Sequence, residues 1–161
     1  MTSTGLLLTP LDTCQLIQFD TDGDELRRVQ LPDDMEPLHA VESPTGTFIV
    51  SRYNKQLLQG QVSEVNTGGE VLRQFSSSHL PSLRYIPHLA VDSRGNIFVA
   101  DYRNRRILLL DARLKFRRVI VDEHQLNYKQ PWRLCYIEQS GQLLVGVVEA
   151  TDIPVFDVVC R

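Results

Sequence analysis

The sequence predicts an all-β protein built from about four copies of one unit, and three observations support this. The turn glycines Gly46, Gly95 and Gly141 recur 49 and 46 residues apart. Short β-branched and aromatic runs, such as Phe48–Ser51 and Ile97–Ala100, follow the turns. No stretch longer than about ten residues shows a helical period of apolar side chains. A strand-rich repeat of about 40–50 residues is typical of β-propeller blades.

The first copy (blade 1, residues 5–33) begins with Gly5 and three leucines and reaches Asp20 after a second apolar run. Its glycine lies 15 residues before Asp20, close to the 16 residues that separate Gly95 from Asp111. Apolar and polar residues then alternate over Leu26–Leu31, as in an outer strand with one wet face. The copy therefore has three strands and lacks the first one.

The second and third copies (blade 2, residues 36–76; blade 3, residues 86–122) have four strands each. Their turns, Asn66–Gly69 and Ser93–Asn96, contain glycine, which adopts a positive φ without strain. The fourth copy (blade 4, residues 130–161) opens at Pro131, as blade 3 opens at Pro87, and has three strands. The strands of the first and fourth copies do not complement each other into one four-stranded blade. We therefore expect an incomplete ring that belongs to a six-bladed propeller.

Composition indicates an ordinary globular chain and excludes several classes of protein. Of its 161 residues 42% are hydrophobic and 23% charged, and the formal net charge of −3 does not predict a nucleic-acid or membrane partner. No apolar run approaches the ~20 residues of a membrane-spanning helix. The N-terminus lacks the basic region of a secretory signal, so we expect a cytoplasmic protein. Cys14, Cys135 and Cys160 are too widely spaced to suggest a disulfide framework or a zinc motif.

The third copy resembles the NHL repeat, whose pattern includes Ala-Val-Asp, Gly-Asn-Ile-Tyr-Val-Ala-Asp and Asn-His-Arg-Ile. The matching segments are Leu89–Asp92, Gly95–Asp101 and Asn104–Ile107. The second copy departs from the pattern, with Ser51 in place of the strand-end Asp and Asn54–Leu57 for the signature. The first and fourth copies keep the turn glycine and lose the signature, with Thr13–Leu16 and Ala150–Ile153 in its place.

This resemblance implies an NHL-type propeller and a role in recognition. In the family such propellers form the C-terminal part of tripartite-motif ubiquitin ligases, where they bind protein substrates or, in several members, single-stranded RNA. Ligase chemistry in those proteins belongs to a zinc-binding RING module, and this sequence has no such Cys/His array. The resemblance therefore implies the substrate-recognition part of a ubiquitin ligase-type protein.

Three signature residues of blade 3 have a predicted structural role. Asp101, Asn104 and Arg106 fall in one turn between two strands. A strand-end carboxylate, a turn amide and a guanidinium can bond to one another and hold the hairpin. We expect this structural role for all three residues, and Arg106 is in addition a candidate binding residue.

Charge and aromatic residues suggest where a partner would bind. Residues 103–118 carry a local excess of +6, whereas residues 20–42 carry −6. Such separation can steer a charged partner, although the basic residues divide between a loop and an outer strand. Aromatic neighbours offer stacking surfaces for the bases of a single-stranded nucleic acid. The predicted binding residues are Tyr53, Lys55, Tyr102, Arg103, Arg105, Arg106 and Trp132.

Catalysis, metals and cofactors are not predicted. His39, His79, His88 and His124 are the histidines; His39 and His88 follow the opening prolines of blades 2 and 3, but not in the same column. Zinc needs three or four converging ligands, and no such set recurs. The sequence also lacks nucleophile-elbow, phosphate-loop and zinc-protease motifs. We therefore expect a non-catalytic module that binds a protein or peptide. The alternatives are binding of single-stranded RNA and a fragment of a lyase- or lactonase-like enzyme that carries zinc or calcium.

Overall fold

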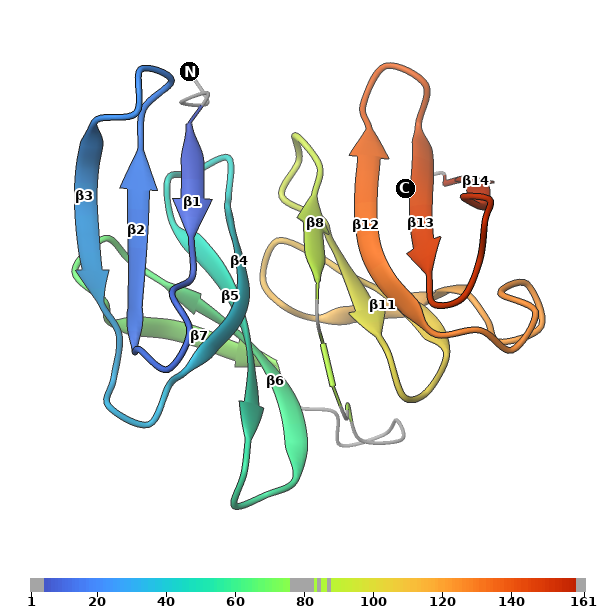
Figure 1. Cartoon of the computed structure of the whole chain (residues 1–161), viewed down its shortest axis with the longest axis horizontal. Helices are drawn as coiled ribbons and strands as arrows, with labels where there is room; N and C mark the ends of the chain where they lie inside the picture. The colour runs from blue at the N-terminus through green and yellow to red at the C-terminus, as the bar shows by residue number, and fades with distance from the viewer. Residues whose placement is uncertain (1–4, 76–82, 84, 87, 159–161) are drawn as a thin grey trace.

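The computed structural model describes residues 5–75, 83, 85, 86 and 88–158 of the chain and contains fourteen strands and no helix in this part (Figure 1). The strands form four antiparallel sheets of three, four, four and three strands. The predicted all-β class and the strand count of each copy are confirmed. Pro87, His79 and Cys160 lie outside the described residues.

Each sheet is a meander in which strands pair in chain order. Short turns join antiparallel neighbours, which is the connection that antiparallel pairing allows. The first sheet contains β1 (Leu6–Leu8), β2 (Gln15–Phe19) and β3 (Glu25–Gln30). The second contains β4 (Pro37–Glu42), β5 (Phe48–Asn54), β6 (Gln59–Val65) and β7 (Val71–Phe75).

The third and fourth sheets continue the same plan. The third contains β8 (Leu89–Val91), β9 (Ile97–Asp101), β10 (Arg106–Leu110) and β11 (Phe116–Val121). The fourth contains β12 (Pro131–Ile137), β13 (Gln142–Val147) and β14 (Val155–Asp157). The sheets of blades 1 to 4 fall within the four sequence segments named above.

One turn recurs at the outer hairpin of blades 1, 2 and 3. The side-chain Oδ1 of Asp20, Asn66 and Asp111 accepts hydrogen bonds from the backbone N–H groups two and four residues later, at 2.9–3.0 Å. This short polar side chain stabilises the tight turn, as an Asx turn does. The residue that adopts a positive φ is glycine in the first two copies, whereas Leu114 adopts it in the third.

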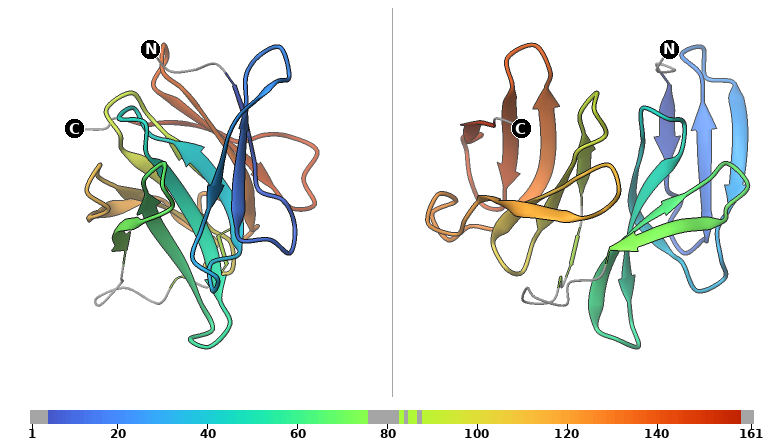
Figure 2. Two further views of the ribbon diagram at one scale, coloured as in Figure 1. Left: turned by 90° about the vertical axis from the view of Figure 1, so that its left-hand side faces the viewer. Right: turned by 180° about the vertical axis from the view of Figure 1, so that it is seen from behind.

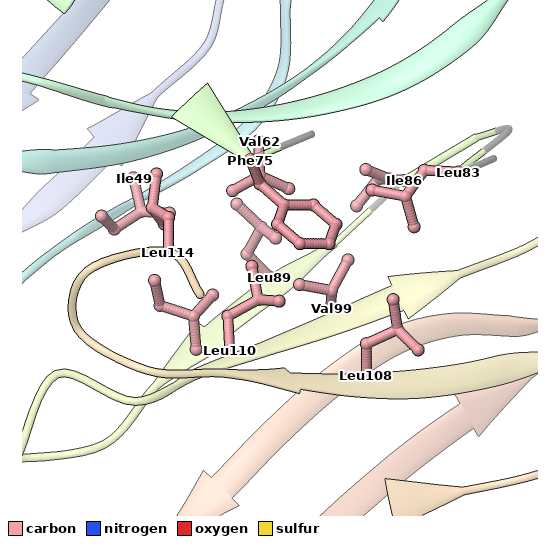
Figure 3. Close-up of a cluster of buried hydrophobic side chains, with 11 residues drawn as sticks. Ile49, Val62, Phe75, Leu83, Ile86, Leu89, Val99, Leu108, Leu110 and Leu114 are labelled. Atoms are coloured by element: carbon pink, nitrogen blue, oxygen red, sulfur yellow. The ribbon is translucent and has the colours of Figure 1, made fainter. Parts of the chain in front are cut away.

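Apolar side chains pack between successive sheets. The core between blades 2 and 3 combines Ile49 and Val62 with Leu89 and Leu110, and all four are nearly or fully buried (Figure 3). Two similar clusters fill the interfaces of blades 1 and 2 and of blades 3 and 4. Residues adjacent on one strand, such as Phe48 and Ile49, belong to different clusters because successive strand side chains point to opposite faces. Strands β5 and β9 are thus buried on both faces.

The sheets stand side by side with the first strand of each blade innermost. β8 lies beside both β4 and β12, while blades 1 and 4 lie at opposite ends of the array (Figures 1 and 2). The described residues therefore form an incomplete propeller of four blades, with the inner strands of blades 2, 3 and 4 along the axis.

Candidate functional site

Equivalent positions on three inner strands carry His39, His88 and Arg133. Each precedes the residue that packs against the preceding blade, namely Ala40, Leu89 and Leu134. Each also lies opposite a small residue of the second strand: Ser51 pairs with His39 and Gly146 with Arg133, and the Ala100 N–H donates to the His88 carbonyl at 3.2 Å. A Cβ on Gly146 would come within 3.2 Å of the Arg133 Cβ, so small residues make room for the axial side chains.

The structure corrects the sequence alignment of the two histidines, which placed them in different columns. A β-bulge separates Pro37 from His39 in the pairing of β4 with β5, so counting from the proline misplaces the strand by one residue. Counting from the turn glycine gives the right register, because His39 and His88 both lie seven residues before it. This signal was present in the sequence.

The two histidines stack on each other and bond to the next blade. Their ring centroids are 3.8 Å apart with 23° between the ring planes. His39 Nδ1 accepts the Leu89 N–H at 3.0 Å, and His88 Nδ1 accepts the Leu134 N–H at 3.2 Å. An imidazole that accepts at Nδ1 while neutral carries its proton at Nε2. Both rings therefore present one N–H donor each.

Burial and nearby positive charge keep both rings neutral. Burial, followed by the charges of His88 and Arg133, lowers the pKa of His39 from 6.5 to about 3. Burial and Arg133 lower the pKa of His88 to about 4. Desolvation disfavours the charged imidazolium, and a positive neighbour acts in the same direction.

Three aromatic side chains gather next to Arg133. Tyr102, on the β9–β10 hairpin, contacts Tyr85 and Trp132 edge-on, with ring centroids 5.7 and 5.6 Å apart, and Tyr85 lies 6.4 Å from Trp132. The Tyr102 N–H donates to the Tyr85 carbonyl at 3.0 Å, which ties the hairpin to the segment before β8. We call Tyr85, Tyr102 and Trp132 the aromatic cluster. Tyr102 and Trp132 were predicted, whereas Tyr85 was missed because nothing in its local sequence marks it.

Arg133 extends the aromatic cluster toward the axis. Its guanidinium carbon lies 5.1 Å from the centre of the Trp132 ring, within cation–π distance. Neighbours along a strand normally point to opposite faces, but a β-bulge between Pro131 and Arg133 turns the two side chains together. Arg133 forms no ion pair within the described part of the chain.

The expected hydrogen bonds form among Asp101, Asn104 and Arg106. We call these three side chains the hairpin lock. The Asp101 Oδ2 accepts from Arg106 Nε and from Asn104 Nδ2, both at 2.8 Å. Asp101 is fully buried and the Arg106 side chain is 11% exposed. Arg106 was also predicted to bind a partner. In the structure its guanidinium is largely buried and stabilises the hairpin through Asp101.

The basic segment does not form one surface. Arg103 and Arg105 are exposed on the β9–β10 hairpin, whereas Arg113 to Arg118 lie on the turn and strand after β10. The five residues of β10 place the turn with Arg113 and Lys115 about 16 Å from the hairpin, whereas Arg118 pairs with Leu109 part of the way back along β11. The predicted excess of +6 is thus divided among the hairpin, the outer turn and the outer strand of blade 3.

Tyr53 and Lys55 lie in a different place from the aromatic cluster. Together with Asp33, Asp34 and Glu36 they line a cleft of about 200 Å³ between blades 1 and 2. Lys55 Nζ lies 3.8 Å from Glu36 Oε2. No described contact joins either residue to the aromatic cluster.

Blade 2 departs from the signature for a geometric reason. From the turn glycine to the end of the second strand there are six residues in blade 3 and eight in blade 2, so the β5–β6 hairpin is two residues longer. Ser51 lies five residues after Gly46, as Ala100 lies five residues after Gly95, so Ser51 is the counterpart of Ala100 rather than of Asp101. The turn glycines Gly46, Gly95 and Gly141 all have a positive φ, as their repeat role predicts.

Comparison with known proteins supports the propeller fold. A protein of unknown function from Bacteroides caccae aligns over 95% of this chain and 57% of its own, with a TM-score of 0.58 and 17% identity. A catalytically inactive virginiamycin B lyase from Staphylococcus aureus, solved with quinupristin, aligns over 91% of this chain and 46% of its own (TM-score 0.65, 12% identity). Hydrazine synthase from Kuenenia stuttgartiensis aligns over 96% of this chain and 43% of its own, with a TM-score of 0.63 and 11% identity.

The chain is a β-propeller array. At such low identities the likeness establishes the fold alone, and the chain spans between about a third and somewhat over half of the structures it resembles. No protein-family model matches the chain, and no curated protein matches it in sequence. A search of the described residues finds no helix suited to crossing a membrane, and no group of three or more His, Cys, Asp or Glu side chains that could hold a metal ion.

Proposed function

We propose that this chain is a non-catalytic recognition module that binds a peptide segment of a protein partner on the aromatic cluster. The observation that carries the proposal is that the aromatic cluster and the Arg133 guanidinium lie in contact with one another between blades 3 and 4. Tyr, Trp and Arg are the residues that most often dominate binding energy at protein interfaces. Their large, rigid surfaces bind with little loss of conformational entropy.

Partial exposure supports this proposal. Trp132 is 37% exposed, although its ring lies 5.6 Å from that of Tyr102 and 6.4 Å from that of Tyr85. A ring that is half covered by neighbours of the same protein keeps a fixed orientation and leaves apolar area for a partner. The repeated blades supply a rigid scaffold beneath it.

The test uses a matched pair of exposed aromatic residues. Peptides that bind the chain are selected from a displayed random library, and their affinities are then measured for Trp132→Ala and Phe116→Ala. Phe116 has nearly the same exposure, 38%, but lies on the outer strand β11. We expect Trp132→Ala to weaken binding at least about tenfold, as loss of an interface anchor does, and Phe116→Ala to leave it unchanged. Equal effects of the two changes would refute the proposal.

Single-stranded RNA is a second candidate partner. Arg103 and Arg105 are exposed on the same hairpin as Tyr102, and neither forms an ion pair within the described residues. Arginines around stacking aromatics are typical of single-strand binding. This function predicts that an oligonucleotide binds with affinity that falls steeply with salt, because phosphate contacts release counterions. Binding that is absent, or insensitive to salt, would dismiss it.

The NHL resemblance extends the main proposal to ubiquitin ligase-type proteins. In such proteins the partner is a substrate, and a RING module performs the ligase reaction. The extension is tested by joining a RING module to the chain and following ubiquitination of a selected partner. The Trp132→Ala change should reduce modification in proportion to the lost affinity, whereas equal modification would contradict substrate selection by this site.

A further inference from the structure

The axial positions of blades 2, 3 and 4 form a group of hydrogen-bond donors without a carboxylate. His39 and His88 are adjacent through their stack, and the charge of Arg133 acts on both rings. Among the described residues, no hydrogen bond or ion pair joins any of these three side chains to a carboxylate. The group therefore has the electrostatic character of a site for an anion.

Hydrogen bonding fixes which atoms remain available. Both Nδ1 atoms accept backbone N–H groups of the following blade. Each neutral ring then offers only the Nε2–H, and neither Nε2 has a partner among the described residues. Arg133 Nη1 donates to the Trp132 carbonyl at 3.2 Å, which leaves further guanidinium donors for a ligand.

The geometry of the donors suits a carboxylate. A guanidinium presents parallel N–H bonds that match the two oxygens of a carboxylate. Trp132 lies against the same guanidinium, so a peptide anchored on the aromatic cluster passes directly beside the axial donors.

We infer that His39, His88 and Arg133 form a binding site for a carboxylate, supplied by an acidic side chain or the C-terminus of a peptide seated on the aromatic cluster. This inference rests on the proposed function for its peptide and on the axial geometry for its carboxylate. It narrows the partner from any protein segment to one that places a negative charge at the propeller axis.

The test follows imidazole and guanidinium NMR signals of the 161-residue chain during titration with N-acetylglutamate or with N-acetylglutaminamide, in which both carboxyl groups are amidated and no charge remains, at constant ionic strength. We expect saturable shifts of His39, His88 and Arg133 with N-acetylglutamate, at a Kd on the order of millimolar, and none with the uncharged analogue. Equal shifts with both compounds would overturn the inference.

Variants assign the binding to the axis. Arg133→Gln should weaken N-acetylglutamate binding at least about tenfold, because it removes the charged bidentate donor. The control Arg117→Gln makes the same charge change on the exposed face of β11 and should leave binding intact. Equal weakening by both changes would show a general charge effect and overturn the site.

A third variant separates this inference from the proposed function. Trp132→Ala should abolish binding of library-selected peptides and retain saturable N-acetylglutamate shifts at the histidines. If N-acetylglutamate binds as expected and no selected peptide depends on Trp132, the proposed function fails and the carboxylate site stands. If selected peptides depend on Trp132 but neither N-acetylglutamate nor an acidic peptide responds to Arg133→Gln, the carboxylate site fails alone.

Discussion

At the scale of single residues, burial decides what each charged side chain does. Asp101 lies fully inside blade 3 and has two side-chain donors, whereas Glu25 forms its ion pair with Arg28 at the surface. A buried carboxylate has no water to replace a lost partner, and an exposed one does. The same bond length of 2.8 Å therefore has different consequences at the two places.

This difference predicts the effect of removing a partner. Arg106→Leu should lower the free energy of unfolding by about 3–5 kcal/mol, because it leaves Asp101 buried with an uncompensated charge. Arg28→Leu, the surface control, should change the unfolding midpoint little. Urea unfolding followed by circular dichroism measures both. Similar midpoints for the two variants would contradict the structural role of the lock.

The axial histidines predict an acid sensitivity. The unfolded chain protonates His39 near pH 6.5, whereas the folded chain does so near pH 3, so the stabilising contribution is complete above pH 6.5 and is lost as the pH falls toward 3. Between pH 7 and 5.5 the loss from His39 is about 1 kcal/mol. His39→Gln keeps an acceptor for the Leu89 N–H and does not titrate, so its unfolding free energy should fall less over this range. An identical pH dependence in both proteins would contradict the neutral, buried state of His39.

At the scale of elements, the recurring outer turn has the same backbone conformation in blades 1 and 2 but different neighbouring atoms. Gly23 and Gly69 occupy the same turn position with φ of 91° and 84°. A Cβ on Gly23 would meet nothing within 4 Å, whereas one on Gly69 would overlap the carbonyl oxygen of Gln30 in blade 1. The turn of blade 2 is therefore also a contact between blades.

The two glycines form a matched pair for mutation. Gly23→Ala should cost about 1 kcal/mol, the strain of a left-handed backbone with a Cβ. Gly69→Ala adds a backbone clash to the same strain, so it should cost at least about 2 kcal/mol more. Chemical denaturation gives both values. Equal costs would show that blade 1 shifts freely against blade 2.

The elements also show what could be predicted from sequence. The four-copy organisation, strand counts and hairpin lock followed from glycine spacing and signature residues, because turns and buried strands depend on local residue types. The axial register was misplaced because it was counted from the proline across the bulge before His39, although counting from the turn glycine gives it correctly. The aromatic cluster was found in part, because Tyr85 meets Trp132 across blades. Contacts between blades depend on packing that no local pattern encodes.

At the scale of the whole molecule, the ends of the array differ from its interior. Leu7 packs into the core shared by blades 1 and 2, while Leu6 and Leu8 on the opposite face of β1 are 57% and 41% exposed. Leu6, Leu8 and Phe19 line a hollow on this outer face. Exposed apolar strands of this kind tend to associate.

We expect the chain to self-associate through this end face at micromolar concentrations. Replacing both Leu6 and Leu8 by Glu should shift the protein toward monomer, because each added charge must be desolvated in the contact. The control Leu11→Glu alters a residue that is 89% exposed in the β1–β2 hairpin and should have no such effect. Analytical ultracentrifugation measures the distribution. A monomeric wild-type chain would contradict the expectation.

The hydrogen bonds of the two stacked imidazoles run the same way along the chain, because each ring accepts an N–H of the blade that follows it. The tautomer of His39 depends on an amide of blade 3, and that of His88 depends on an amide of blade 4. Blade 3 thus fixes the proton position of a histidine in blade 2, and blade 4 fixes that of a histidine in blade 3. Displacing β12 would remove the Leu134 N–H bond that fixes the proton of His88 at Nε2, so this proton would exchange between the two ring nitrogens, whereas His39 would keep its own bond to the Leu89 N–H.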